Sequence, residues 1–439
     1  MKRFWIVVIV ILAIGLIAGG AAFAQGQKKT CRIWFWGEDE AVGITDWMNE
    51  NAQLYNQLHP DVTWEVTHLN IDAIYTGLKA AMEAKDAPEL HTVWGGLNTL
   101  QFAWTGEIVP ISDYVSKDTI SHLYAGEKSG TFWNGKLWGV GMYLDPWYLA
   151  INKTVWKAAG LDPNKLPTNW KDFISALKKV KAAGYIPFIA GMKDGYFADF
   201  FSSAMQYEYY DSVEGYHRGM LGQESLAKAP HDQWWYNVQE LRDQGLFNKD
   251  ASSLTLGEVV DAFNKGKAAC TSMVQPQVVQ AIAALGKDNV TVMVCPVPSN
   301  AKMKGTMPIP VNPLIIPAVA KYKEEAGKFI EFFLSPERQA ALYEKTGVLP
   351  ASDYIPDSAM KTQADQITLR LTKTKSSFTY QEHTPPAVLE SLYAICQELV
   401  AGDIDARTAA QKYEAAAAKW RTENPKDVEN YRKWAPESR

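Results

Sequence analysis

Apolar residues follow two different spacings along the chain. Continuous or alternating apolar runs over residues 31–36, 62–66 and 90–96 predict buried strands. Between these runs, apolar residues recur every three or four positions over 44–58 and 74–85, which predicts amphipathic helices. Strands that alternate with helices are typical of a doubly wound α/β layer with a mainly parallel sheet. The first third of the chain is therefore predicted to form such a layer.

From Thr168 the pattern changes to longer helices. Residues 169–184 place Trp170, Phe173 and Leu177 on one face and end at Gly184, a residue type common after helices. Helical spacing continues to about residue 265, strands return at 267–274, 289–298 and 312–319, and helical spacing resumes from Glu324. A chain of this length is too long for one ordinary hydrophobic core, so we expect two domains.

The first 24 residues form a separate segment. Basic residues at positions 2 and 3 precede an apolar run from Phe4 to Ile17, and the sequence Ala-Phe-Ala occupies positions 22–24. This order is typical of a cleavable secretory signal, whereas a retained membrane anchor, the alternative, would need about 20 apolar residues. No cysteine stands directly after the predicted cleavage point, and the residues before Cys31 lack the apolar and small residues of a lipoprotein signal, so a lipoprotein is not expected. We predict a mature protein that begins at Gln25 and is exported to the periplasm or the cell exterior.

Charge and short motifs limit the possible functions. The formal net charge is −5 and no long basic run follows the signal segment, which disfavours a nucleic-acid partner. The seven histidines show no metal-ligand spacing, and Cys31, Cys270, Cys295 and Cys396 form no C-x-x-C pair, so we expect neither a metal nor a cofactor. Cys270 and Cys295 could form a disulfide or remain as buried thiols. Common hydrolase and nucleotide-binding motifs are missing, but two carboxylates that meet only in the fold leave a secreted glycoside hydrolase open.

Five stretches of the chain resemble one known family. They are "GKLWGVGMYLDPWYLAINK" from Gly135, "LHPDVTWEV", "TGEIVPISDYV", "EVVDAFNKGKAACTSM" and "AGKFIEFFLSPERQAALYEKTGVLPAS". Each stretch alone is a weak signal. All five, in the family's order, are similar to the extracellular solute-binding proteins of ABC importers, in particular the maltose-binding-protein-like sugar-binding branch, family 1.

This resemblance implies an α/β, two-lobed periplasmic-binding-protein-like fold of type II, in which each lobe is a sheet flanked by helices and a hinge joins the lobes. After a signal peptide at 1–24, lobe 1 would hold residues 25–145 plus 311–353, and lobe 2 residues 146–310 plus 354–439. The implied function is non-catalytic: a monomer captures a sugar or small oligosaccharide between its lobes and delivers it to a membrane permease. A binding protein for a non-sugar small solute is a further alternative.

A sugar site combines aromatic rings, which cover C–H faces, with amides and carboxylates that bind hydroxyls. Trp36 and Trp94 come at the ends of predicted strands, where open α/β sheets bind ligands. Asp145 matches, by its register with "AINK", an acidic ligand-binding position of the family, and Trp147 would point to the same side. Packing between the lobes is the alternative for this pair. The complete set of candidates is Trp36, Glu38, Asp39, Trp94, Asn98, Asp145, Trp147, Asp194, Tyr196, Gln275, Gln277 and Asn312.

Overall fold

The computed structural model describes residues 28–205, 209–210, 212–296, 301, 303, 305–377 and 379–438. The predicted signal peptide and the predicted mature start at Gln25 lie outside the described residues. Within the described ranges, no helix combines the length and the apolar character that a membrane crossing requires.

One lobe is built on a five-stranded sheet with the strand order β2-β1-β3-β12-β4. Strands β1, β2 and β3 are parallel, as the alternating pattern predicted, whereas β12 runs antiparallel to both β3 and β4. The elements of this lobe are β1 (Lys29–Phe35), α2 (Ile44–Leu58), β2 (Val62–His68), α3 (Ala73–Glu83), β3 (Leu90–Thr92), α4 (Leu97–Thr105), β4 (Ile108–Val109), α5 (Lys117–His122), α6 (Ala125–Ser129), β5 (Phe132–Trp133), β6 (Lys136–Leu137), β12 (Leu314–Pro317), α14 (Lys323–Phe333) and α15 (Pro336–Thr346).

The other lobe contains a four-stranded sheet with the order β10-β7-β9-β8. Unlike the first sheet, this sheet is mainly antiparallel, because β7 runs antiparallel to both of its neighbours and only β8 and β9 are parallel. The first residue of β7, Trp147, pairs with the last residue of β9, Val274. The amino end of β7 therefore lies beside the carboxyl end of β9, and the chain enters this lobe at that end of the sheet.

The elements of this lobe up to the fourth strand are β7 (Trp147–Asn152), α7 (Lys153–Ala158), α8 (Trp170–Ala182), β8 (Ile186–Phe188), α9 (Tyr196–Met205), α10 (Val213–Met220), α11 (Gln233–Asp243), α12 (Leu256–Asn264), β9 (Ala268–Val274), α13 (Gln275–Leu285) and β10 (Val290–Met293). The sequence predicted helices over most of the stretch between β7 and β9, and the structure has six of them there among the described residues.

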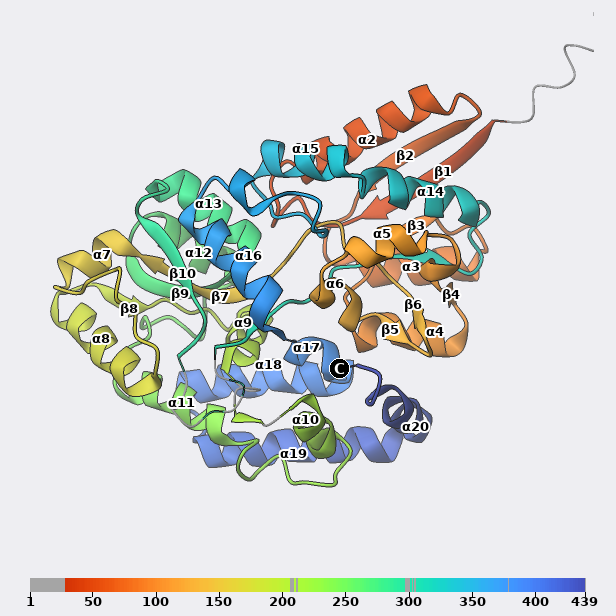
Figure 1. Cartoon of the computed structure of the whole chain (residues 1–439). Coiled ribbons are helices and arrows are strands. Elements are labelled where there is room, and N and C mark those ends of the chain that lie inside the picture. Colours follow the sequence, from red (N-terminus) through yellow and green to blue (C-terminus); the bar gives the residue numbers. More distant parts are fainter. Residues whose placement is uncertain are drawn as a thin grey trace, which may run out of the picture.

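Helices of the last third of the chain cover both lobes. They include, with two short strands, β11 (Met307–Pro308), α16 (Gln363–Lys375), β13 (Ser376–Ser377), α17 (Tyr380–His383), α18 (Pro386–Ala401), α19 (Ala406–Glu423) and α20 (Pro425–Trp434). Helices α14 and α15 pack on α2, and α18 and α19 pack on α11 (Figure 1). Helix α20 returns to the first sheet's side, where the Trp434 indole Nε1 donates to the carbonyl of Phe132 at 3.1 Å.

Two strands begin close to the predicted lobe boundaries at residues 145/146 and 310/311. Strand β7 begins two residues after Asp145, and β12 begins one residue after Pro313. The residue bounds of the two lobes stay a prediction.

The Cys270 thiol is free and fully buried, and burial raises its pKa well above the usual range. A disulfide between Cys270 and Cys295, one of the two possibilities left by the sequence, is therefore not formed in this structure.

Candidate functional site

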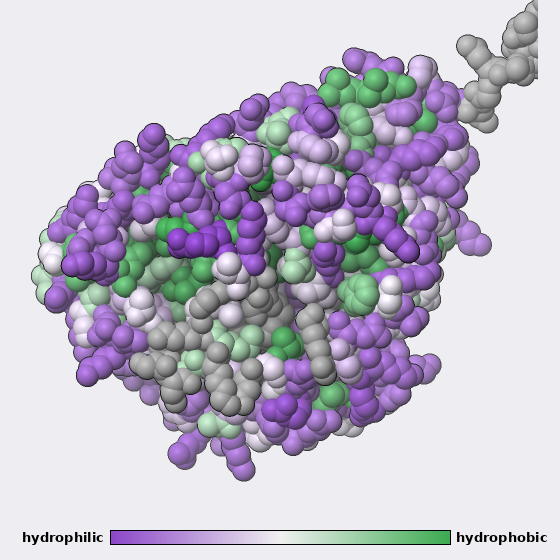
Figure 2. Space-filling model, viewed as in Figure 1, coloured by the Kyte–Doolittle hydropathy of each residue, from purple (hydrophilic) through white to green (hydrophobic). Residues whose placement is uncertain are grey.

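A cavity of about 400 Å³ lies between the two sheets. The residues that line it come from the carboxyl ends of β1 and β3, from the segment that leads into β7, and from α9, α12 and α13. Nine of the twelve predicted site residues line this cavity: Trp36, Asp39, Trp94, Asp145, Trp147, Asp194, Tyr196, Gln277 and Asn312. The face of the molecule drawn in Figure 2 is covered mainly by hydrophilic residues, with hydrophobic residues in patches between them.

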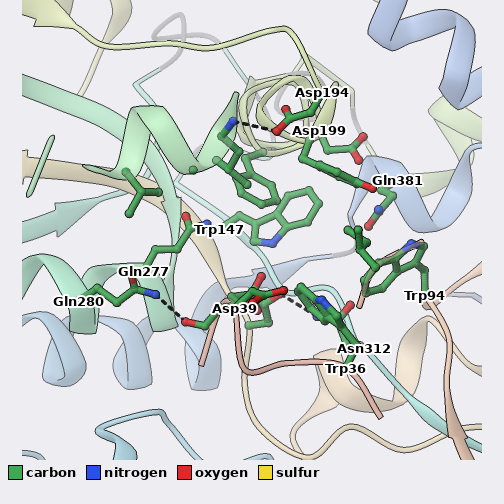
Figure 3. Close-up of a pocket in the computed structure, with 18 of the residues that line it drawn as sticks. Trp36, Asp39, Trp94, Trp147, Asp194, Asp199, Gln277, Gln280, Asn312 and Gln381 are labelled. Atoms are coloured by element: carbon green, nitrogen blue, oxygen red, sulfur yellow. Dashed lines mark hydrogen bonds between the residues drawn. The ribbon is translucent and has the colours of Figure 1, made fainter. Parts of the chain in front are cut away.

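Aromatic rings form two opposed walls of the cavity. Trp36 follows β1 and Trp94 follows β3, and their rings meet edge to face with centroids 5.0 Å apart. On the other wall, the Trp147 ring packs on Phe200 of α9 with centroids 4.7 Å apart. Figure 3 shows the Trp147 ring pointing into the space between the labelled polar side chains. A planar apolar ligand face can therefore be covered from two sides.

Asp145 lies at the floor of the cavity and is 3% exposed. Its Oδ2 accepts a hydrogen bond from Asn312 Nδ2 at 3.2 Å, while its Oδ1 has no hydrogen-bond partner among the described residues. Burial raises the pKa of Asp145 well above its usual range, and repulsion from Glu40 adds to the rise. Burial likewise raises the pKa of Glu40 to about 7, although a hydrogen bond from Tyr143 opposes this. Burial therefore favours the protonated form of both carboxyls, and a protonated carboxyl both donates to and accepts from hydroxyl groups.

Two further carboxyls face the cavity at α9 (Figure 3). Asp194 precedes the helix and accepts the backbone N–H of Leu256, at the start of α12, at 2.9 Å. Asp199, in the first turn of α9, is 1% exposed and accepts the hydroxyl of Tyr393 through Oδ2. Its Oδ1 has no partner among the described residues, and burial raises the pKa of Asp199 well above its usual range.

Side-chain amides complete the polar lining. Gln277 and Gln280 project from α13, Asn312 precedes β12, and Gln381 lies in α17. Gln280 Nε2 donates to the carbonyl oxygen of Glu40 at 2.9 Å, so a helix of one lobe contacts a loop of the other across the cleft. Amides offer both donors and acceptors to a ligand.

A second cavity of about 680 Å³ adjoins the first. Both are lined by Ile71, Trp94, Asp194, Tyr196 and Gln381, so the two form one continuous groove. The predicted residue Asn98 lines only this second cavity, with its amide nitrogen buried and unpartnered among the described residues.

Two predicted site residues do not line either cavity. Glu38 accepts the backbone N–H groups of Gly43 and Thr45, both at 2.8 Å, so its carboxylate stabilises the start of α2. Gln275 is 1% exposed, and its amide bonds Asp365 and the 347–349 segment. The physical reason is the same for both: nearby backbone groups already satisfy these side chains.

The sequence reading missed several lining residues. They include Glu40, Ile71, Asp199, Phe200, Leu256, Val260, Asp261, Asn264, Gln280 and Gln381. For Asp199 a signal existed, because an acidic residue inside the aromatic run "YFADFF" requires a polar environment. Gln280 and Gln381 lie on helices, and no feature of the sequence distinguishes them from surface residues.

All charged residue types that line the first cavity are acidic. Its lining contains six carboxyl side chains, and none of the described lining residues is lysine, arginine or histidine. Across the described part of the chain, no group of three or more His, Cys, Asp or Glu residues could hold a metal ion.

Two α/β lobes with a lined cleft between them define a two-lobed binding protein of the type II periplasmic class. Residues 41–340 match the model of the family described as bacterial extracellular solute-binding protein. The chain belongs to this family.

Similar proteins include the sn-glycerol-3-phosphate-binding periplasmic protein UgpB of Brucella abortus, 27% identical over 198 residues, which are 40% of each chain. The chain thus matches about two fifths of the length of this relative. Among solved structures, a chitin oligosaccharide binding protein has a TM-score of 0.79 at 17% identity and covers 90% of this chain and 99% of its own. A protein from a study of xylan utilization by Caldanaerobius polysaccharolyticus has a TM-score of 0.75 at 22% identity and covers 88% and 99%. These structural likenesses show the fold.

Proposed function

We propose that this chain is the non-catalytic substrate-binding component of an ABC transporter, which captures a sugar or small oligosaccharide in the cleft and delivers it to the membrane permease. The observation that carries the proposal is the cavity lining. Trp36 and Trp147 lie on opposite walls, and carboxyls and amides, among them Asp145 and Asn312, surround the space between them. A pyranose presents C–H faces to such rings and hydroxyls to such polar groups. One structurally similar protein is named as a chitin oligosaccharide binding protein, which supports this ligand class.

The continuous groove favours a ligand longer than one ring. The second cavity adds Tyr75, Phe102 and Tyr393 as further aromatic surface, and Asn98 and Gln101 as further amides. The same combination of ring and amide thus recurs beyond Trp94, as successive sugar units require.

The chain's cellular setting follows from its family and its first 24 residues. We propose a monomer that is exported by a cleaved signal peptide and carries no lipid at its mature start. A membrane permease is its partner, and nucleic acid is not.

Two alternatives use the same cleft. A phosphorylated solute, such as the ligand named for UgpB, would need cationic groups, and none of the described residues lining the first cavity supplies one. A glycoside hydrolase would use two of the carboxyls as catalytic groups. Incubation with candidate oligosaccharides separates these cases, because a receptor returns each sugar unchanged and binds it one to one.

The test begins with thermal unfolding of the mature protein against a panel of neutral mono- and oligosaccharides. A ligand at 100 times its dissociation constant stabilises the folded state by roughly 2.7 kcal/mol. A panel without a single stabilising sugar, combined with stabilisation by glycerol 3-phosphate, would overturn the proposal.

Calorimetric titration of Asp145→Asn then locates the site. We expect binding to weaken about two- to tenfold, because a hydrogen bond between uncharged groups contributes about 0.5 to 1.5 kcal/mol. The matched control is Asp403→Asn, an exposed aspartate after α18, which leaves affinity unchanged. Equal affinity in both variants, with unchanged melting, would place the sugar elsewhere.

A further inference from the structure

The cleft contains more carboxyl groups than a neutral sugar needs. Six carboxyl side chains line the first cavity without a described cationic residue among them. Of these, Asp39 is exposed, Asp261 forms an ion pair with Lys265 at 2.5 Å, and Glu40 and Asp145 form a buried pair whose charges repel each other. Asp194 and Asp199, at the start of α9, remain as a separate acidic wall.

Among these carboxyls, Asp199 combines near-complete burial with an oxygen that has no hydrogen-bond partner among the described residues. It is 1% exposed, one oxygen accepts the Tyr393 hydroxyl, and the other oxygen lines the cavity without a partner among the described residues. Its pKa is lowered by the hydrogen bond from Tyr393 and raised by repulsion from Glu390, which is itself acidic. A buried carboxylate with an unused oxygen is costly unless a cation or a donor occupies the space beside it.

Aromatic rings lie on the same wall. Phe200 follows Asp199 in α9, and the Trp147 ring packs against Phe200. Figure 3 shows the labelled side chains Asp194 and Asp199 on one side of the Trp147 ring. The face of an aromatic ring attracts a cation, most strongly when the site is desolvated. Carboxylates next to such rings are therefore a site for an ammonium group.

We infer that the cleft selects a saccharide that carries a protonated amine, and that the Asp199 carboxylate, with Asp194 beside it, pairs with this amine. The amides and the Asp145–Glu40 pair bind the hydroxyls, and the tryptophan rings cover the sugar faces. This inference rests on the proposed carbohydrate function and names the charge class of its ligand.

The experiment uses matched pairs of sugars in which an amine replaces the hydroxyl at one carbon of each ring. Glucose is compared with glucosamine, galactose with galactosamine, and cellobiose with its diamino counterpart; the N-acetylated forms control for size. Putrescine serves as a cation without a sugar ring. Titrations are run on the mature protein at about pH 7, where amines of this kind are largely protonated.

We expect at least one amino sugar to bind ten or more times more tightly than its hydroxyl and N-acetyl counterparts. In Asp199→Asn this preference falls by at least tenfold. Asp194→Asn, a second variant that keeps its acceptor for the Leu256 N–H, reduces the preference to a smaller extent. Asp403→Asn, exposed and distant from α9 in sequence, preserves it.

The outcomes separate the inference from the function beneath it. Neutral sugars that bind as tightly as, or more tightly than, their amino counterparts overturn the inference and leave the proposed function standing. Binding of putrescine without any saccharide overturns both. A preference for amines that survives intact in both Asp199→Asn and Asp194→Asn overturns the assignment to this wall.

Discussion

Replacement of Glu382 by glutamine should make the protein more stable at alkaline pH. Glu382, in α17, is fully buried between the two lobes' elements, with its carboxyl packed against Gly95 and Gly130. Its Oε1 accepts the backbone N–H of Val311 at 2.9 Å. Burial raises the pKa of Glu382 to about 8, and the nearby Glu127, also buried, has its pKa raised by burial and by repulsion from Glu382.

The direction of the pH effect follows from these shifts. A glutamate in the unfolded chain loses its proton near pH 4.3, whereas folded Glu382 keeps its proton until about pH 8. The stability that this group contributes is therefore fully present below the unfolded pKa and is lost as pH rises toward 8. Each unit of that interval costs about 1.4 kcal/mol, so the loss between pH 5 and pH 8 is on the order of 4 kcal/mol.

Glutamine keeps the acceptor for Val311 and cannot lose a proton, so the variant lacks this part of the pH dependence. Urea unfolding of the ligand-free protein at pH 5, 6.5 and 8 measures it. We expect the free energies of unfolding of parent and Glu382→Gln to differ little at pH 5 and by a few kcal/mol at pH 8. Glu344→Gln, an exposed glutamate in α15, controls for loss of a negative charge. Curves for parent and Glu382→Gln that stay parallel over this range would refute the reasoning.

Four further outcomes are expected. Trp94→Ala removes a ring that lines both cavities. Calorimetric titration should show oligosaccharide affinity reduced about five- to 150-fold, because the lost ring contact contributes about 1 to 3 kcal/mol of binding free energy. Unchanged affinity would exclude a stacking role for Trp94. Gly96→Ala should lower the melting temperature far more than Gly106→Ala. Both glycines have positive φ, but only at Gly96 would an added Cβ lie 2.1 Å from the carbonyl oxygen of Glu382. Equal losses of melting temperature in the two variants would contradict this packing. Saturating ligand should decrease the radius of gyration measured by X-ray scattering, because only a closed form lets both lobes contact one ligand, and an unchanged radius would count against closure. Mass spectrometry of exported protein should find a chain that starts at Gln25, and retention of the first residues would reject cleavage.

Local patterns in the sequence were sufficient to predict most elements of the fold. The helix predicted over residues 44–58 has those bounds in the structure, since its apolar stripe and its helix-ending His59-Pro60 are both local features. The same kind of reasoning placed Trp36 and Trp94 at strand ends, and both line the cavity. A ligand-facing position at the end of a parallel strand can be predicted because strand direction fixes which edge of the sheet faces the cleft.

The tertiary structure alone decided which polar groups are satisfied by the protein and which are left for a ligand. Glu38 and Gln275 have the same character in sequence as Asp39 and Gln277, yet only the second pair lines the cavity, and Gln277 does so while its Oε1 accepts the backbone N–H of Val274. The partner of Asp145, Asn312, lies 167 positions away, and nothing local to either residue predicts their contact. A sequence pattern shows which face of an element is apolar, but the element that covers that face, and so the burial of Asp199, depends on how distant segments pack.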